Sequence, residues 1–334
     1  MNSRASLAAA ASVVAGLIAL PTSATAAPGP GADALTAVVI HDVPLTTEIE
    51  QRILRYWTPD RMTRALPPLR PGARSRPQPA RLPYRVAPQT VPFTSARRDT
   101  QQAAVSANSR GAVWPDQGRV RATTGKVFFT MGGRDYLCSA GTVTSANRDT
   151  VVTAGHCVKN GTGAWAENWI FVPGYRDGSG PAGGFVARRM FAGAQWSEHA
   201  DDDYDVAMVA LGTADGKHVT DAVGAQAIGF NRPRGNRVYG FGYPASGAYD
   251  GERLVYCSGR PHTDAHSRAH GLGLRCDMTQ GSSGGPWLTD FDPATGAGTF
   301  TSVSSFKYAD DSGTMYGPYF GDAVRSLYDK AQRG

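Results

Sequence analysis

Many short β-rich runs, separated by turn residues, constrain the fold of this chain more than any other feature. Between residues 126 and 303, runs rich in Val, Phe, Tyr and Thr alternate with glycine, asparagine and aspartate. Such a series is typical of an all-β sandwich or barrel. Only residues 322–331 read clearly as a helix, with Val324, Leu327 and Tyr328 on its apolar side. The expected strands are 126–130, 136–139, 150–153, 169–172, 185–187, 206–211, 237–240, 254–257 and 299–303.

The first 27 residues read as a secretory signal. Arg4 supplies the positive start, residues 13–20 form an apolar run, and Ala24-Thr25-Ala26 is a small-residue cleavage site. The apolar run is too short to span a bilayer, and no later stretch is longer. We therefore expect a secreted, extracellular protein that does not associate with membranes.

The following segment is rich in proline and arginine. Residues 28–110 contain 12 of the 22 prolines, and 12 arginines against 6 acidic residues, whereas residues 111–334 are nearly neutral. Because the net charge of +6 is carried by this segment, a nucleic-acid partner is not expected. Proline fixes φ and removes backbone donors, which favours an extended arm or linker. We expect a signal peptide (1–27), a propeptide or linker (28–118) and a folded domain (119–334).

One island in this segment differs from its surroundings. Thr46 or Thr47 could cap a short helix that ends at Thr58-Pro59, because a residue before proline avoids helical backbone angles. The apolar side of this expected helix carries Ile49, Ile53, Leu54 and Trp57.

Four cysteines, an even number in a chain with a secretory signal, favour disulfides over metal or redox chemistry. Three pairings are possible. The intervals make Cys138–Cys157 and Cys257–Cys276 the local ones, and we prefer them.

Gly281-Ser282-Ser283-Gly284-Gly285-Pro286 is the stretch most suited to chemistry. Its glycines let the backbone turn sharply and approach a bound molecule closely. The N–H groups of Gly281 and Ser283 could stabilise the oxyanion that forms when a serine hydroxyl attacks a carbonyl. Such a hexapeptide is commonly a mere loop, so the interpretation needs a histidine base and a buried carboxylate elsewhere.

Candidates for both partners are present. His156 is the only one of 7 histidines with both a strand leading into it and a cysteine neighbour, and imidazole exchanges protons near neutral pH. Asp205 heads the apolar run 206–211, where a partly buried carboxylate needs a hydrogen-bond donor such as His156. The neighbouring residues 201–203, all aspartates, look more like a solvated acidic loop.

Taken in order, Thr-Ala-Gly-His-Cys, Asp-Val-Ala-Met-Val and Gly-Ser-Ser-Gly-Gly-Pro resemble the motifs of the chymotrypsin-like (trypsin-like) serine peptidases, over roughly residues 119–334. Phe241-Gly-Tyr-Pro244 and Cys276-Asp-Met-Thr-Gln-Gly281 are similar to the bacterial secreted branch that includes glutamyl endopeptidases, and residues 53–62 to the propeptides of actinomycete members. The resemblance implies an all-β fold of two antiparallel six-stranded β-barrels with a C-terminal helix, preceded by a signal peptide and a propeptide. The site is expected in the cleft between the barrels.

The same resemblance implies the role of each residue. His156 becomes the general base, Asp205 its orienting carboxylate and Ser283 the nucleophile, while the N–H groups of Gly281 and Ser283 form the oxyanion hole. In the family, a cysteine placed like Cys138 pairs with the one after the histidine. We expect a monomeric endopeptidase that acts on protein or peptide substrates without a cofactor or metal. Its propeptide is a candidate intramolecular inhibitor.

Ser282 departs from the pattern of the animal enzymes. Those carry an aspartate at this position, which captures the new N-terminus after activation cleavage. Serine has no charge and cannot form that ion pair. Activation is therefore expected to remove a blocking segment without depending on an inserted N-terminus.

Substrate preference is read from two positions. Asp277 lies six residues before Ser283, where trypsin-like enzymes place the aspartate that binds Arg or Lys, and a carboxylate pairs well with a guanidinium. Glutamate-preferring relatives carry a histidine on the strand after the nucleophile, where this chain has Ser304 in Ser-Val-Ser-Ser-Phe. These features favour cleavage after Arg or Lys, with glutamyl, apolar or broad preference as the alternatives.

Three other functional classes remain open. His262, His266 and His270 would align on one face of a helix, as metal ligands do, but their Gly/Arg-rich surroundings favour a loop. A metal-dependent hydrolase built on them is one alternative. A serine esterase with the same mechanism is a second, and a non-catalytic binding module on the same fold is a third.

Overall fold

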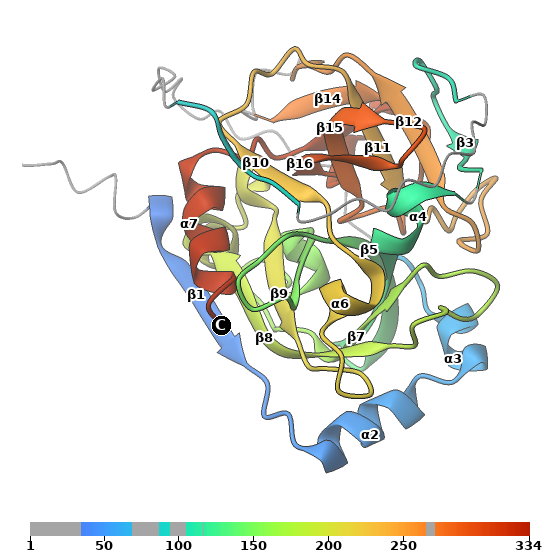
Figure 1. Cartoon of the computed structure of the whole chain (residues 1–334), viewed down its shortest axis with the longest axis vertical. Coiled ribbons are helices and arrows are strands. Elements are labelled where there is room, and N and C mark those ends of the chain that lie inside the picture. The colour runs from blue at the N-terminus through green and yellow to red at the C-terminus, as the bar shows by residue number, and fades with distance from the viewer. Residues whose placement is uncertain (1–34, 69–86, 94–104, 116, 265–270) are drawn as a thin grey trace, which may run out of the picture.

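The structure is a computed structural model that describes residues 35–68, 87–93, 105–115, 117–264 and 271–334. The predicted signal peptide, most of the proline-rich run and two of the three clustered histidines, His266 and His270, lie outside the described residues. Strands dominate the described part (Figure 1). Among these residues, no helix is long and apolar enough to cross a membrane.

A closed six-stranded antiparallel barrel forms the first half of the fold. Its strand order is β8-β7-β4-β5-β6-β9, and the pairing of β8 with β9 closes the ring. On β4, Val127 and Phe129 pack into the barrel core, whereas Phe128 between them joins a second apolar cluster outside it. The strands are β4 (Thr124–Met131), β5 (Arg134–Thr142), β6 (Thr150–Thr153), β7 (Glu167–Pro173), β8 (Phe185–Gly193) and β9 (Ala207–Leu211).

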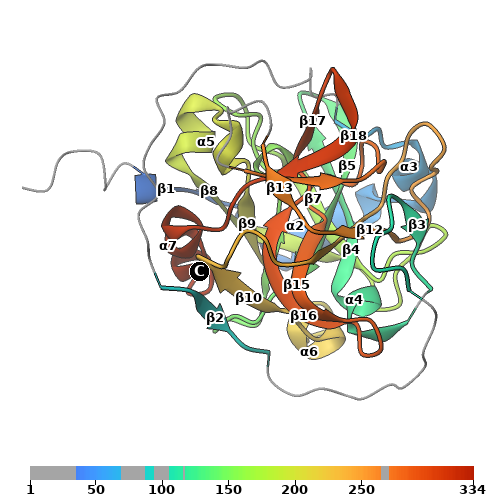
Figure 2. The same ribbon diagram turned by 90° about the horizontal axis from the view of Figure 1, so that it is seen from above.

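Two sheets make up the second half, seen from above in Figure 2. Both contribute to one apolar cluster that contains Leu274, Trp287 and the Cys257–Cys276 disulfide, so they enclose a common core. Apart from a short parallel pair between β10 and β16, their ladders are antiparallel. One sheet runs β2 (Gln89–Val91), β10 (Ala227–Phe230), β16 (Ala297–Val303), β15 (Pro286–Asp292), β11 (Val238–Gly242), β12 (Val255–Gly259) and β3 (Ala112–Val113). The other runs β13 (His262–Thr263), β14 (Leu272–Arg275), β18 (Asp311–Gly317) and β17 (Phe306–Tyr308).

The predicted all-β fold with a C-terminal helix is confirmed. Each run expected to be a strand overlaps one, and the helix α7 spans Asp322–Ala331 as predicted. Its residues Val324, Leu327 and Tyr328 are buried, and the Tyr328 hydroxyl donates to the Thr144 carbonyl at 2.8 Å. The remaining helices after residue 117 are short: α4 (Gly118–Thr123), α5 (Ala194–His199) and α6 (Val219–Val223), with 3₁₀ turns η1 (Gly155–Cys157) and η2 (Asp202–Tyr204).

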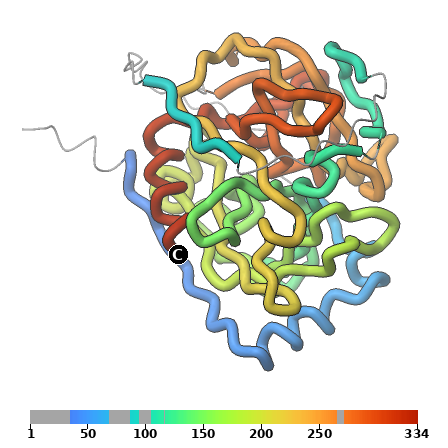
Figure 3. The backbone as a smooth tube through the Cα atoms, viewed as in Figure 1, coloured from blue at the N-terminus to red at the C-terminus, as the bar shows by residue number. Residues whose placement is uncertain are grey.

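Residues 38–68, which we call the strap, wrap around the outside of the first barrel (Figure 3). Strand β1 (Val38–Asp42) pairs with β8, and the helices α2 (Thr47–Tyr56) and α3 (Pro59–Arg64) follow. Thr46 accepts a hydrogen bond from the Ile49 N–H, as the sequence predicts for a helix cap. Ile53 and Trp57 are buried, and Trp57 contacts Phe128 of β4. Leu54 departs from the predicted apolar side, because 39% of it is exposed.

A second part of the expected propeptide packs into the second half of the fold. Strand β3 pairs with β12, and Trp114 is buried edge-on against Phe241 and Tyr256. The domain boundary at 118/119 stays a prediction. The burial of Trp114 favours a folded domain that begins upstream of it, because an indole removed from this cluster would leave a large cavity.

Candidate active site

The first barrel brings His156 and Asp205 to the same end. Strands β6 and β9 are antiparallel, and Thr153 at the end of β6 lies opposite Ala207 at the start of β9. A residue just after β6 and one just before β9 must therefore meet. The turn η1 carries His156, and Asp205 follows η2.

The imidazole and carboxylate of these residues form a buried, hydrogen-bonded pair. Nδ1 of His156 lies 2.8 Å from Oδ2 of Asp205, and the His156 backbone N–H donates to Oδ1 at 2.8 Å. The side chain of His156 is 5% exposed and that of Asp205 fully buried. A carboxylate only accepts, so Nδ1 carries the proton and Nε2 presents a lone pair. Nε2 is itself buried and has no hydrogen-bond partner among the described residues.

Ser305, which the sequence analysis did not identify, completes the surroundings of Asp205. It lies between β16 and β17 in the second half, and its hydroxyl donates to Oδ2 of Asp205. Its neighbour Ser304, the position predicted from the sequence to affect substrate preference, has a buried hydroxyl that instead accepts from the Trp287 indole at 3.1 Å. The Ser-Ser pair was visible in the sequence, but the strand register that orients each hydroxyl was not.

The loop that carries Ser283 lies directly against the residues that lead to His156. The Ser139 N–H donates to the Ser283 carbonyl at 2.7 Å, and Sγ of Cys157 lies 3.8 Å from the same oxygen. At Gly284 (φ 81°), a Cβ would lie 2.1 Å from Oγ1 of Thr153, so only glycine fits there. Within 281–289, Ser283 is the one residue that is not fully buried. The Ser283 backbone therefore lies beside η1, the turn that carries His156, and among the described residues no hydrogen bond joins the Ser283 hydroxyl to Nε2 of His156.

Hydrogen bonds fix the rest of this loop and leave two N–H groups available. The Ser139 hydroxyl donates to the Gly281 carbonyl at 2.9 Å, and the Ser282 hydroxyl to the Thr279 carbonyl at 2.6 Å. Gly281 adopts φ 97°, which favours glycine. Within the described part of the chain, the N–H groups of Gly281 and Ser283 donate to no other protein group.

Both predicted disulfides are present. Cys138–Cys157 joins β5 to η1 next to His156, and Cys257–Cys276 joins β12 to the segment before the Ser283 loop. Cys138, His156 and Cys157 have potential metal-ligand atoms close together, but both sulfurs are used by the disulfide. Of the three clustered histidines, the described one, His262, lies on strand β13 and not on a helix.

A cavity of about 500 Å³ opens beside Ser283. Asp277 and Lys307 line it together with Thr279, Ser305 and Pro68 of the strap. The Asp277 carboxylate is exposed and accepts the Tyr249 hydroxyl at 2.7 Å. The Lys307 ammonium donates to the Cys276 carbonyl at 2.7 Å and to that of Ser312. Burial lowers the pKa of Lys307 to about 8, although the charges of Asp277 and Asp311 act in the opposite direction.

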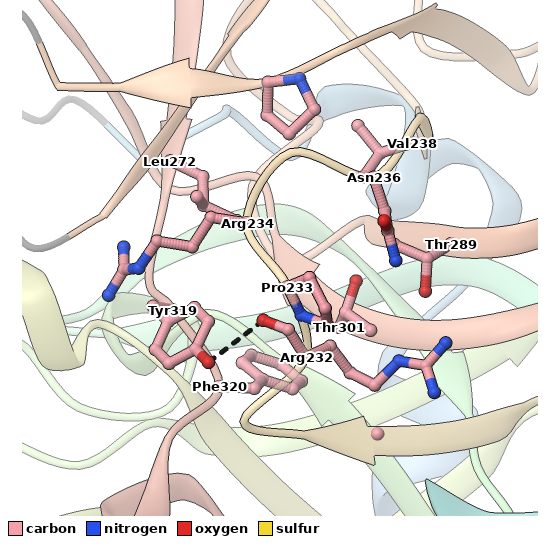
Figure 4. Close-up of a pocket in the computed structure, with 12 residues that line it drawn as sticks. Arg232, Pro233, Arg234, Asn236, Val238, Leu272, Thr289, Thr301, Tyr319 and Phe320 are labelled. Carbon is pink, nitrogen blue, oxygen red and sulfur yellow. Dashed lines mark hydrogen bonds between the residues drawn. The ribbon is translucent and has the colours of Figure 1, made fainter. Parts of the chain in front are cut away.

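A smaller pocket lies in the second half, between Arg232, Asn236, Leu272 and Tyr319 (Figure 4). The Tyr319 hydroxyl donates to the Arg232 carbonyl at 3.0 Å across it. It shares no lining residue with the cavity beside Ser283 and contains none of the predicted site residues.

Comparison with known proteins places this geometry in a family. Residues 139–292 match the trypsin-like peptidase domain. The protease Anisep of Arthrobacter nicotinovorans is 42% identical over 64% of this chain and 96% of its own, with a TM-score of 0.61. The chain belongs to the trypsin-like serine peptidases. The thermostable serine protease AL20 from an extremophilic microorganism is 37% identical to the peptidase, over 64% of this chain and 99% of its own, with a TM-score of 0.61.

Two more distant matches add less. A Glu endopeptidase shares the fold of the peptidase at 17% identity and a TM-score of 0.53, over 69% of this chain and its own full length. A 73-residue stretch is 34% identical to the extracellular metalloprotease of Bacillus subtilis, which is 22% of this chain and 23% of that protein. The first two matches and the family domain identify the peptidase as a serine endopeptidase.

Ser305→Ala tests the contact with the buried carboxylate. A hydrogen bond to a charged group contributes about 2 kcal/mol, so we expect kcat to fall by about thirtyfold while KM changes little. Steady-state hydrolysis of a chromogenic peptide measures both constants. Ser304→Ala is the matched control, because its hydroxyl contacts Trp287 and not Asp205. Equal kcat values in the two variants would contradict the assigned contact.

Proposed function

We propose that the peptidase cleaves peptide bonds through an acyl-enzyme, with Ser283 as nucleophile, His156 as general base and Asp205 as the carboxylate that orients His156. The observation that carries this proposal is the buried bond from His156 Nδ1 to Asp205, which leaves the basic Nε2 facing away from the carboxylate. Burial keeps water from competing for the imidazole and strengthens the charge interaction. The position of the Ser283 loop against Thr153 and Cys157 supports the choice of nucleophile.

The proposed reaction has two halves. The Ser283 Oγ attacks the substrate carbonyl while Nε2 of His156 takes its proton, and Asp205 stabilises the resulting imidazolium. The N–H groups of Gly281 and Ser283 donate to the oxyanion of the tetrahedral intermediate. Nε2 then returns the proton to the leaving amine, which breaks the C–N bond and leaves the acyl group on Ser283. Water, activated by the same imidazole, releases the acid.

Ser283→Ala is expected to leave the fold intact and to lower kcat by several powers of ten, because the three side chains act as a unit. Ser282→Ala is the matched control, since its hydroxyl contacts only the Thr279 carbonyl within the described residues. A fluorophosphonate probe should label the wild type and Ser282→Ala but not Ser283→Ala. Near wild-type turnover in Ser283→Ala, or activity that a chelator abolishes, would refute the proposal.

Cleavage after Arg or Lys is the preference we propose, with Asp277 as the residue that binds the cation. Its support is the carboxylate in the cavity beside Ser283. Lys307 lines the same cavity and repels a cationic substrate side chain while it is protonated. The preference for a basic residue is therefore expected to be moderate at neutral pH.

The charge of Lys307 in the cavity should make the preference for Arg or Lys depend on pH. Because the pKa of Lys307 is lowered to about 8, Lys307 is protonated at pH 7 and mostly neutral at pH 9.5, whereas a substrate arginine stays charged. We expect kcat/KM for an Arg peptide, divided by that for a Phe peptide, to rise about tenfold between these pH values. Lys307→Met should remove the rise, and Asp277→Asn should lower the ratio throughout. A Glu peptide that is preferred at pH 7 and lost above pH 8 would instead make Lys307 the specificity residue.

We further propose that the peptidase is exported as a precursor in which the strap restrains it. Support for export comes from the sequence features of residues 1–27 and from the two disulfides. Support for restraint comes from the end of the strap: the Leu66 N–H donates to the Asp135 carbonyl at 3.1 Å, and its carbonyl accepts from the Leu137 N–H at 2.9 Å. Two residues later, Pro68 lines the cavity beside Ser283. A peptide substrate and the strap would therefore compete for this edge of β5.

Trp57→Ala tests this restraint in the full-length precursor. Loss of the buried Trp57 indole weakens the docking of the strap on the first barrel by about 4 kcal/mol. We expect the uncleaved Trp57→Ala precursor to hydrolyse a chromogenic peptide at least tenfold faster than the wild-type precursor. Each rate is divided by the amount of uncleaved chain, which is measured on a gel. Arg55 lies on the exposed side of α2, the helix that ends just before Trp57, and Arg55→Ala should behave as wild type. A Trp57→Ala precursor that stays as inactive as wild type would contradict the restraint.

A further inference from the structure

Glu252 links the two halves of the fold through three donors from the first barrel. Its Oε1 lies 3.5 Å from the Lys126 ammonium and accepts the Tyr175 hydroxyl at 3.2 Å, and its Oε2 accepts the Gly178 N–H at 3.0 Å. Lys126 belongs to β4 and the other two donors follow β7, whereas Glu252 lies in the loop between β11 and β12 of the second half. We call these four residues the clamp.

The ammonium of the clamp is buried, and its carboxylate is partly buried. The Lys126 side chain is 1% exposed and that of Glu252 23%. Burial lowers the pKa of Lys126, while the charges of Glu252 and Asp250 oppose the shift. The ammonium also lies 4.1 Å from the centre of the Tyr175 ring. Removing Glu252 would leave the buried Lys126 ammonium without its carboxylate partner, so the loop that carries Glu252 is strongly tied to the first barrel.

The loop that carries Glu252 also holds the backbone peptide group between Gln280 and Gly281. Its Ala245 N–H donates to the Gln280 carbonyl at 2.7 Å, and Ser246 exchanges hydrogen bonds with Thr279 at 3.3 and 2.9 Å. The Gln280 carbonyl and the Gly281 N–H belong to one peptide group, which is planar and trans. Fixing that carbonyl on Ala245 therefore fixes the direction of the Gly281 N–H. A flipped peptide would turn this donor away from the substrate.

We propose that Lys126 and Glu252 are positioning residues that keep the Gly281 N–H aimed at the oxyanion. The inference rests on the proposed function, in which that N–H is one of the two oxyanion donors. It also gives a physical basis for activation without an inserted N-terminus, since Ser282 carries no charge to capture one. The buried ammonium of Lys126 on β4 instead holds the loop that carries Glu252 against the first barrel.

Lys126→Met and Glu252→Gln test the clamp in the processed enzyme. Removing one oxyanion donor costs about 100- to 1,000-fold in kcat, so loosening it should lower kcat about tenfold to a hundredfold. We expect KM to change less than twofold. The inhibition constant of a peptidyl trifluoromethyl ketone, whose adduct carries an oxyanion, should rise by the same factor as kcat falls. Thermal unfolding establishes that each variant is folded at the assay temperature.

Arg188→Met is the matched control for loss of a partly buried cation. Arg188 donates to the Leu211 and Gly334 carbonyls and pairs with Asp149 at 3.4 Å, without contact to the Ser283 loop. It should lower the unfolding temperature and leave kcat and the inhibition constant unchanged. If folded Glu252→Gln keeps the wild-type kcat and inhibition constant, or if only its KM changes, the positioning role of the clamp is refuted. A wild-type enzyme that fluorophosphonate does not label would instead refute the proposed function.

Discussion

The buried carboxylate of Asp205 is the interaction on which the site depends. A charge with no exposure is tolerated only where donors surround it, and this one accepts from the His156 backbone, the His156 ring and the Ser305 hydroxyl. Two of these donors come from the first barrel and one from the second half. The same carboxylate therefore orients the imidazole and requires the two halves to be docked. Separating the halves would take the Ser305 hydroxyl away from this carboxylate. The proposed catalysis therefore depends on the docking of the two halves.

The sequence predicts the elements that carry their own signal. The strands of the first barrel are rich in β-branched and aromatic residues, and α7 has regular apolar spacing between Val324 and Tyr328, so all are located. The bounds of α7 are correct, whereas β5 and β8 extend well beyond the predicted 136–139 and 185–187. Strand β18 reads Asp-Ser-Gly-Thr-Met-Tyr-Gly and has no such signal. It is extended because β14 and β17 supply hydrogen bonds on its two sides, which is information outside the segment itself.

The same limit applies to the site. The motifs around His156, Asp205 and Ser283 are local, so the sequence contains them. The structure joins His156 to Asp205 by a hydrogen bond and places the Ser283 backbone beside Cys157. Ser305, Lys126 and Glu252 make contacts with residues 77 to 126 positions away in the sequence, and no local pattern marks them. Asp277 shows the converse: its spacing from Ser283 is local, but its partners Tyr249 and Lys307 become visible only in three dimensions. Composition predicted an extended arm, whereas packing of Trp57 against Phe128 makes the strap part of the folded structure.

The pairing of β1 with β8 has a consequence for the mature protein. Strand β8 is paired with β7 only at Phe185 and Val186. Residues 189–192 pair with β9 on one side, and residues 189–193 pair with β1 on the other. In the maturation proposed above, loss of the strap would take the β1 neighbour from five consecutive residues of β8 and leave an open sheet edge. Such an edge recruits extended polypeptide by backbone hydrogen bonds alone. Maturation by loss of the strap would thus leave unpaired backbone groups on the barrel wall, to which another chain can add a strand.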